Sequence, residues 1–299
     1  MSKFHRKPAS PAARWHADAA GLQASPASQP PAPAFQVAQE RAALVADLHF
    51  AVQRNQFELH YQPQFGIDGR LLGAEALIRW RHARLGLILP GRFIALAEET
   101  GLIIPIGSWV LEEACRVLRR WSGRGGLHAL VLSVNVSARQ LQLPDFVDRL
   151  EAQLRAAGVA PHRLRIELTE SVLIGDMDAA LSQSHALRRI GVGLSLDDFG
   201  TGYSSLSYLW RLPLDELKID QSFTRDMLGN DGALAIVRLI IELGHSLRLT
   251  VLAEGVETVG QRDGLAALGC DAFQGFLYGM PVPLADCEAR HAVAGCAGP

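Results

Sequence analysis

The sequence has little of several features that would assign it to a specialised class. It contains four cysteines in 299 residues, with no Cys-x-x-Cys pair, and only 7% of its residues are aromatic. Cysteine this sparse excludes a disulfide framework in a chain of this length. Cys115, Cys270, Cys287 and Cys296 are therefore interpreted as reduced thiols, which are typical of a cytoplasmic protein.

Long apolar runs and a strong excess of charge are also absent. The longest strongly apolar stretch, residues 102–111, is too short to span a bilayer, and no apolar segment follows the basic residues near the N-terminus. The formal net charge is -2, which provides no long-range field to attract DNA or RNA. We expect neither a membrane span nor a nucleic-acid partner, so local groups must hold any anionic substrate.

The composition changes along the chain. Residues 1–38 hold six of the fifteen prolines and a single acidic residue, Asp18, which predicts a disordered leader. From Glu40 onward, Leu44, Leu48 and Val52 recur at helical spacing and predict an amphipathic helix. With 48% hydrophobic residues in the chain, we expect one large folded domain over 39–292 and a short tail over 293–299.

Short β-rich runs alternate with longer amphipathic segments throughout this domain. Their number and order predict an α/β fold, a modified TIM (β/α)₈ barrel, with a doubly wound open sheet as the alternative. The short turn at residues 66–69 predicts a hairpin, so the first strand should be antiparallel. The expected strands are 57–64, 71–80, 130–136, 164–168, 193–196, 216–219, 249–253 and 272–276, with helices over 92–99, 107–121, 145–157, 177–190, 233–247 and 259–268.

Polar side chains interrupt these strands near their ends. Because residues i and i+2 of a strand share a face, Glu75 and Arg79 should point together into the barrel. The ends of the later strands carry further polar residues, and the carboxyl ends of barrel strands form the catalytic face. Asp197 and Asp198 are adjacent, so both reach one site only if the strand bends. The inward set is Glu75, Asn135, Glu167, Asp197, Asp198, Lys218 and Glu254.

Five carboxylates in one cleft repel one another and lose hydration, so such a cluster requires cations. Oxygen ligands without His or Cys favour Mg²⁺ or Mn²⁺, and their number favours two metals bridged by one carboxylate, for which Asp197 is the candidate. Two-metal sites suit in-line displacement at phosphorus. Lys218 could orient the attacking water or stabilise the transition state, and Arg79 could clamp a phosphate oxygen. These residues indicate a metal-dependent phosphoester hydrolase.

Each of these residues also has a structural interpretation. A single acidic residue at a strand end is more often a helix cap or a surface residue than a metal ligand. Asp198 could cap the segment that follows it, and Arg79 could simply pair with Glu75 along the strand. The joint occurrence of these residues on one barrel rim favours the site.

Eight ordered motifs carry a resemblance to a known family. From about residue 40 to 290 the chain resembles EAL-domain cyclic di-GMP phosphodiesterases. The motifs are Tyr61-Gln62-Pro63, Glu75-Ala76-Leu77, Asn135-Val136-Ser137, Glu167-Leu168-Thr169-Glu170, Asp197-Asp198-Phe199-Gly200, Lys218-Ile219-Asp220, Glu254-Gly255-Val256-Glu257 and Gln274-Gly275-Phe276.

The resemblance implies hydrolysis of one phosphodiester bond of cyclic di-GMP, a bacterial second messenger, to linear pGpG by metal-activated water, with two Mg²⁺ (or Mn²⁺) as cofactors. It places Lys218 at the attacking water and Glu170 where it steadies the loop after Asp198. It implies that one metal is held by Glu75, Asn135, Glu167 and Asp197, that the other is held by Asp197, Asp198 and Glu254, and that the dinucleotide contacts Gln62, Arg79, Asp220 and Gln274.

In the family, the loop over residues 199–205 couples the metal site to a dimer interface, so a homodimer is expected. An unidentified upstream regulator is also expected, because residues 1–38 are too few for a sensory domain. The chain departs from the family at Gly279, where many members have a basic residue, and at Arg248, which replaces a frequent glycine. Two alternatives remain. One is a catalytically silent EAL domain that acts as a cyclic di-GMP receptor or binds and regulates another protein, and the other is hydrolysis of a different phosphodiester such as pGpG.

Overall fold

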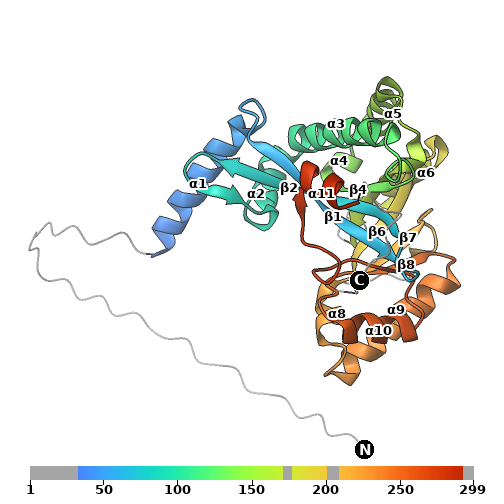
Figure 1. Cartoon of the computed structure of the whole chain (residues 1–299). Helices are drawn as coiled ribbons and strands as arrows, with labels where there is room; N and C mark the ends of the chain where they lie inside the picture. Colours follow the sequence, from blue (N-terminus) through green and yellow to red (C-terminus); the bar gives the residue numbers. More distant parts are fainter. Residues whose placement is uncertain (1–32, 171–176, 201–208, 292–299) are drawn as a thin grey trace, which may run out of the picture. The chain divides into compact units, whose positions relative to one another are not determined.

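The computed structural model describes residues 33–170, 177–200 and 209–291 (Figure 1). The chain divides into two units, Met1–Glu40 and Arg41–Pro299. The barrel and its site belong entirely to the second unit. Within the part of the chain that the structure describes, no helix is long and apolar enough to cross a membrane.

Eight strands form a closed ring. β1 pairs antiparallel with both of its neighbours in the ring, β2 and β9, while the other neighbouring strands of the ring pair in parallel. This confirms the modified TIM barrel with an antiparallel first strand and rules out the open sheet. The ring contains β1 (Phe57–Gly66), β2 (Leu71–His82), β4 (Val131–Asn135), β5 (Leu164–Thr169), β6 (Gly193–Phe199), β7 (Glu216–Ile219), β8 (Thr250–Ala253) and β9 (Ala272–Phe273).

The predicted hairpin joins β1 to β2. Gly69 has φ 75° and its N–H donates to the Gly66 carbonyl, a turn that a glycine adopts without strain. Two short strands that the sequence pattern did not indicate lie outside the ring. β3 (Gly86–Ile88) pairs with β2, and β10 (Val282–Pro283) pairs with β1.

Helices surround the ring in Figure 1. α1 begins at Pro33, inside the segment predicted as leader, because proline suits the first helical position and the alanines and glutamines that follow are good helix formers. The helices are α1 (Pro33–Ala51), α2 (Ile94–Thr100), α3 (Ile103–Ser122), α4 (Ala138–Leu141), α5 (Phe146–Ala157), α6 (Met177–Ile190), α8 (Gln221–Asp226), α9 (Asp231–Ser246), α10 (Val259–Ala267) and α11 (Leu284–His291), with 3₁₀ turns at Pro90–Arg92 and Pro161–Arg163.

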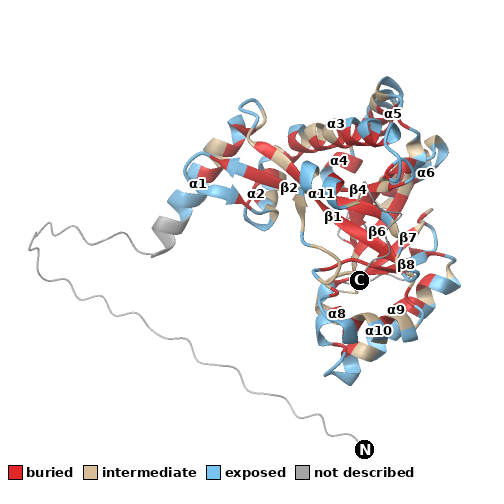
Figure 2. Cartoon of the chain, viewed as in Figure 1, coloured by how far each residue is buried: buried red, intermediate tan, exposed pale blue. Residues whose placement is uncertain are grey.

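The core follows the strand alternation predicted from the sequence. Residues facing the helices, such as Leu132, Ile166 and Leu217, are fully buried, and the strands are the most buried part of Figure 2. A second apolar cluster, which includes Leu48, Trp80 and other residues of α1, α2, β1 and β2, lies beside this core. The helix-facing side of each ring strand is therefore apolar, which leaves the interior face free for polar side chains.

Candidate metal and catalytic site

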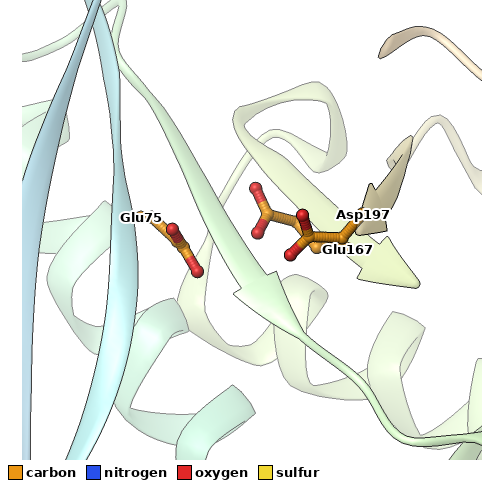
Figure 3. Close-up of side chains that lie close together, drawn as sticks. All are labelled: Glu75, Glu167 and Asp197. Atoms are coloured by element: carbon orange, nitrogen blue, oxygen red, sulfur yellow. The ribbon is translucent and has the colours of Figure 1, made fainter. Parts of the chain in front are cut away.

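The predicted acidic residues converge at the carboxyl ends of the ring strands. Glu75, Glu167 and Asp197, from β2, β5 and β6, can each place a carboxylate oxygen within 4.8 Å of the others (Figure 3). Asp197, Asp198 and Glu254 form a second group within the same limit. Asp197 belongs to both groups, so its carboxylate lies where the two groups meet.

A bend in β6 turns both adjacent aspartates toward the site. The pairing of β6 with β7 shifts between Leu196 and Phe199, and Asp198 has φ 56°, in the left-handed region. Such a bulge lets two consecutive side chains leave the strand on the same side. A left-handed conformation costs about 1–2 kcal/mol for most residues other than glycine, and aspartate is one of the few that adopt it more readily.

Lys218 lies at the centre of the acidic residues and is fully buried. Its Nζ is 2.8 Å from Glu167 Oε2, 3.1 Å from Asp197 Oδ2 and 2.6 Å from Glu254 Oε1. Glu75 Oε2 is a further 3.7 Å neighbour. Burial lowers the pKa of a lysine, but the surrounding carboxylates outweigh this and raise the Lys218 pKa well above its ordinary value. The side chain therefore stays charged.

A single ammonium does not neutralise this cluster. Burial raises the pKa of Glu254 to about 8 and that of Glu167 well above its usual range, although Lys218 opposes both shifts. Burial and the neighbouring Asp197 also raise the pKa of Asp198. Divalent cations would supply the missing positive charge.

Glu75 is held differently from the other acids. Asn135 Nδ2 donates to Glu75 Oε1 at 2.6 Å and Gln274 Nε2 donates to Oε2 at 2.6 Å. Burial raises the Glu75 pKa, but Lys218 and these two amides outweigh it and lower the pKa. This carboxylate is therefore ionised and fixed in place before any ligand binds.

The residues present fit a metal site. Glu167 Oε1 is buried and has no hydrogen-bond partner among the described residues, which is costly for a carboxylate unless a cation contacts it. The other donors are carboxylates, with the amide oxygen of Asn135 left free by the bond that its Nδ2 makes. This all-oxygen set suits Mg²⁺ or Mn²⁺ rather than zinc.

The predicted substrate contacts have different surroundings. Gln62 and Gln274 lie in the site and are hydrogen-bonded to each other at 3.0 Å. Arg79 is buried and donates to the Ile78 carbonyl, and the structure gives no ion pair between it and Glu75. Asp220 caps α8 by accepting from the Ser222 N–H at 3.0 Å. Asp220 can cap the helix with this oxygen and still have its other carboxylate oxygen for the dinucleotide contact that the resemblance implies.

Glu170 is buried at the end of β5. The loop that it is expected to steady, and the motif residues from Thr201 onward, lie outside the described residues. The alternative that Asp198 caps the following segment falls on the same loop.

Sequence reasoning missed Gln64, a polar side chain of the interior that is connected to the site. Gln64 follows Gln62 by two residues on β1, so strand parity alone could have placed it on the same inward face. It is 2% exposed and donates to Gln274 Oε1 at 2.9 Å.

Two cavities lie at the site, and only the first is lined by its carboxylates. One, of about 210 Å³, is lined by Gln62, Glu75, Asp197, Glu254 and the aromatic ring of Phe276, which is half exposed. The other, of about 220 Å³, lies beside Leu77 and Asn135 and is lined mainly by apolar side chains, including Ile106 and Val110. The site therefore offers a polar cleft with an aromatic residue beside it and an apolar chamber next to it.

The fold is a (β/α)₈-type barrel with a reversed first strand, and a cluster of carboxylates lies at the ends of its strands. These two features define a class of barrel proteins whose acidic site is suited to metal ions. The EAL domain family model matches residues 45–281. The chain belongs to the EAL domain family.

Characterised relatives share this region. The chain is 48% identical over 247 residues to the bifunctional diguanylate cyclase/cyclic di-GMP phosphodiesterase MucR of Pseudomonas aeruginosa, an alignment covering 82% of this chain and 36% of MucR. It is 44% identical over 243 residues to the cyclic di-GMP phosphodiesterase NbdA of the same organism, covering 81% of this chain and 31% of NbdA. The chain thus spans about a third of the length of these relatives.

A solved structure agrees with the fold. The PaMucR phosphodiesterase in complex with c-di-GMP superposes with a TM-score of 0.79 at 47% identity, covering 82% of this chain and 99% of that structure.

Proposed function

We propose that this chain is a metal-dependent phosphodiesterase that hydrolyses cyclic di-GMP to linear pGpG. The observation that carries the proposal is the pair of carboxylate groups that share Asp197 around the buried Lys218. The relatives support the substrate, since MucR and NbdA are named for this activity and the solved MucR domain holds c-di-GMP.

We assign the metals to two ligand sets as the family resemblance implies. Glu75, Asn135, Glu167 and Asp197 would hold one Mg²⁺ or Mn²⁺, and Asp197, Asp198 and Glu254 would hold the other. When bound, such ions polarise phosphate oxygens and make water a stronger nucleophile at neutral pH.

The chain's own residues orient the reactants. The resemblance assigns Lys218 to the attacking water. Its three N–H donors here contact Glu167, Asp197 and Glu254, so metal ions that take up these carboxylates would free the ammonium for that role. Arg79 engages the Ile78 carbonyl with one N–H and has others to offer a phosphate oxygen. A planar base would suit the apolar chamber beside Leu77, and the exposed ring of Phe276 offers a stacking surface for the second base.

The test is a chromatographic assay of the folded protein with cyclic di-GMP and Mg²⁺ or Mn²⁺. We expect pGpG to form with metal, and to be lost in EDTA and in Glu75→Ala. Glu151→Ala, which removes an exposed glutamate paired with Arg155 on α5, is the matched control and should keep full activity.

Two other outcomes would identify the alternatives. Binding of cyclic di-GMP without product would contradict the enzyme assignment and favour a receptor. A faster rate on pGpG than on cyclic di-GMP would favour the other phosphodiester as substrate.

We further propose a homodimer, as the resemblance implies. The part of the loop expected to link the site to the interface lies outside the described residues, so the proposal rests on the family. Light scattering on the purified chain tests it, and a monomer at assay concentration with full activity would contradict it.

A further inference from the structure

Three buried glutamines form a chain of hydrogen bonds that ends on Glu75. Gln64 Nε2 donates to Gln274 Oε1 at 2.9 Å, and Gln274 Nε2 donates both to Gln62 Oε1 at 3.0 Å and to Glu75 Oε2 at 2.6 Å. All three amides are less than one-tenth exposed, so water cannot replace a lost bond freely.

Glu75, the last member of this series of hydrogen bonds, fixes which group donates and which accepts in each bond. An ionised carboxylate only accepts hydrogen bonds, so Gln274 must present its NH₂ group to Glu75. Its carbonyl oxygen then faces Gln64, which must in turn donate. The two ends of an amide have nearly the same shape, so a rotated Gln274 would fit the same space but would set its oxygen against the carboxylate. The donor on Gln64 opposes that rotation.

The backbone of Gln274 is held on both sides. Its N–H donates to the Ala253 carbonyl and its own carbonyl accepts from the Val256 N–H. Gln64 lies on β1, where it pairs with Gly73 directly before the register of the hairpin shifts. With the Gln274 backbone held, the orientation of its amide depends on its side-chain partners.

We infer that Gln64 is a positioning residue of the metal site: it orients the Gln274 amide, which holds Glu75 in its ligating position. The inference rests on the proposed function, because it takes Glu75 as a metal ligand. Gln64 touches neither Glu75 nor the reacting atoms in this arrangement and acts through Gln274. Partners of metal ligands typically change metal affinity about 10–100-fold when mutated.

The experiment measures Mn²⁺ binding by calorimetry in the absence of substrate. Gln64→Met keeps the size of the side chain and removes its donor, and we expect Mn²⁺ affinity to fall about tenfold. Gln64→Glu sets an acceptor against the Gln274 oxygen and should weaken binding at least as much. Gln261→Met is the matched control, since Gln261 is a buried glutamine bonded to Thr224 and to the cap of α10. It should lower the melting temperature and leave Mn²⁺ affinity unchanged.

A double-mutant comparison tests whether Gln64 acts on Glu75 through Gln274. If Gln64 acts through Gln274, adding Gln64→Met to Gln274→Met should cause little further loss of Mn²⁺ affinity. Independent, additive losses would overturn the inference, as would a folded Gln64→Met protein with wild-type affinity.

The result is separable from the proposed function. A protein that binds Mn²⁺ but does not hydrolyse cyclic di-GMP contradicts the proposed reaction. The Mn²⁺ affinities of the Gln64 variants can still be measured on it, so the inference about Gln64 is tested all the same. A wild-type protein that binds no Mn²⁺ overturns both.

Discussion

Lys218 is a single, fully buried positive charge shared by several carboxylates. Removing one partner of a buried ion pair typically costs about 3–5 kcal/mol, because the remaining charge is left uncompensated. We expect Lys218→Met to destabilise the metal-free protein by an amount of this order, measured by urea unfolding in EDTA. Saturating Mn²⁺ should restore much of the loss, since the ions replace the missing charge. Equal stability of the two proteins in EDTA would contradict the central role of Lys218.

The protonation of Glu254 gives a pH dependence with a definite sign. Its folded-state pKa of about 8 lies above its ordinary value, so the folded metal-free protein holds a proton that the unfolded chain releases. The stability from this group is therefore complete at low pH and is lost as the pH rises toward and through 8. We expect the wild-type protein in EDTA to lose stability between pH 6 and 8, and Glu254→Gln to lose less. Parallel pH profiles for the two proteins would contradict this.

Strand parity predicted most of the site at the level of the residue. Glu75, Glu167 and Lys218 were placed inward because they alternate with apolar neighbours, and the structure confirms their direction. Gln64 was missed because an uncharged side chain gives no electrostatic reason to suspect it. Hydrogen-bond directions, which distinguish Gln274 as donor to Glu75, need coordinates.

The bulge in β6 is the element that brings two consecutive aspartates into one site. Asparagine tolerates the left-handed conformation better than most residues, whereas alanine does not. We expect Asp198→Asn to be at least as stable as the wild type in EDTA, because it removes a carboxylate that its neighbours repel, and Asp198→Ala to be about 1 kcal/mol less stable than Asp198→Asn. Both should bind Mn²⁺ more weakly, which separates the backbone role from the ligand role. An alanine variant as stable as the asparagine variant would count against a strained bulge.

The turn between α9 and β8 also contains a strained residue. Arg248 is exposed and has φ 61°, at the position where the family frequently has glycine. The penalty for a left-handed side chain exceeds the entropy that glycine loses on folding, so Arg248→Gly should stabilise the protein by about 0.5–1 kcal/mol. Thermal unfolding measures this, with Arg248→Ala as the control that removes the side chain and keeps the strain. A gain in the alanine variant alone would point to the charge instead.

Element boundaries were predictable where periodic patterns are long. The segment 177–190 matches α6 at both ends, whereas β3, β10 and α8 are too short to show a period. The expected strand 272–276 ends as β9 at Phe273, although the Gln274 N–H still donates to the Ala253 carbonyl. The bend in β6 was foreseen as a requirement, but its location came from the structure.

At the scale of the whole molecule, the two carboxylate groups are linked by one residue. We expect the wild-type protein to bind two Mn²⁺ ions per chain and the Glu75→Gln variant to bind one. The Asp197→Asn variant should bind less Mn²⁺ than the Glu75→Gln variant, because Asp197 belongs to both groups. Calorimetry gives the stoichiometry, and Glu151→Gln serves as the control. Each bound ion should also raise the melting temperature by mass action. An Asp197→Asn protein that loses no more metal than Glu75→Gln would contradict a shared ligand.

The reversed β1 strand has a consequence for how the protein is made. Its ring neighbours are β2, which follows it directly, and β9, which lies more than two hundred residues later in the chain. β10 and α11 also pack on it, and Arg124 of the α3–β4 connection holds Glu288 of α11 at 2.6 Å. A ribosome must therefore synthesise nearly the entire domain before the ring can close, so a nascent chain halted before β9 should expose the unpaired backbone edges of β1 and β8 to chaperones.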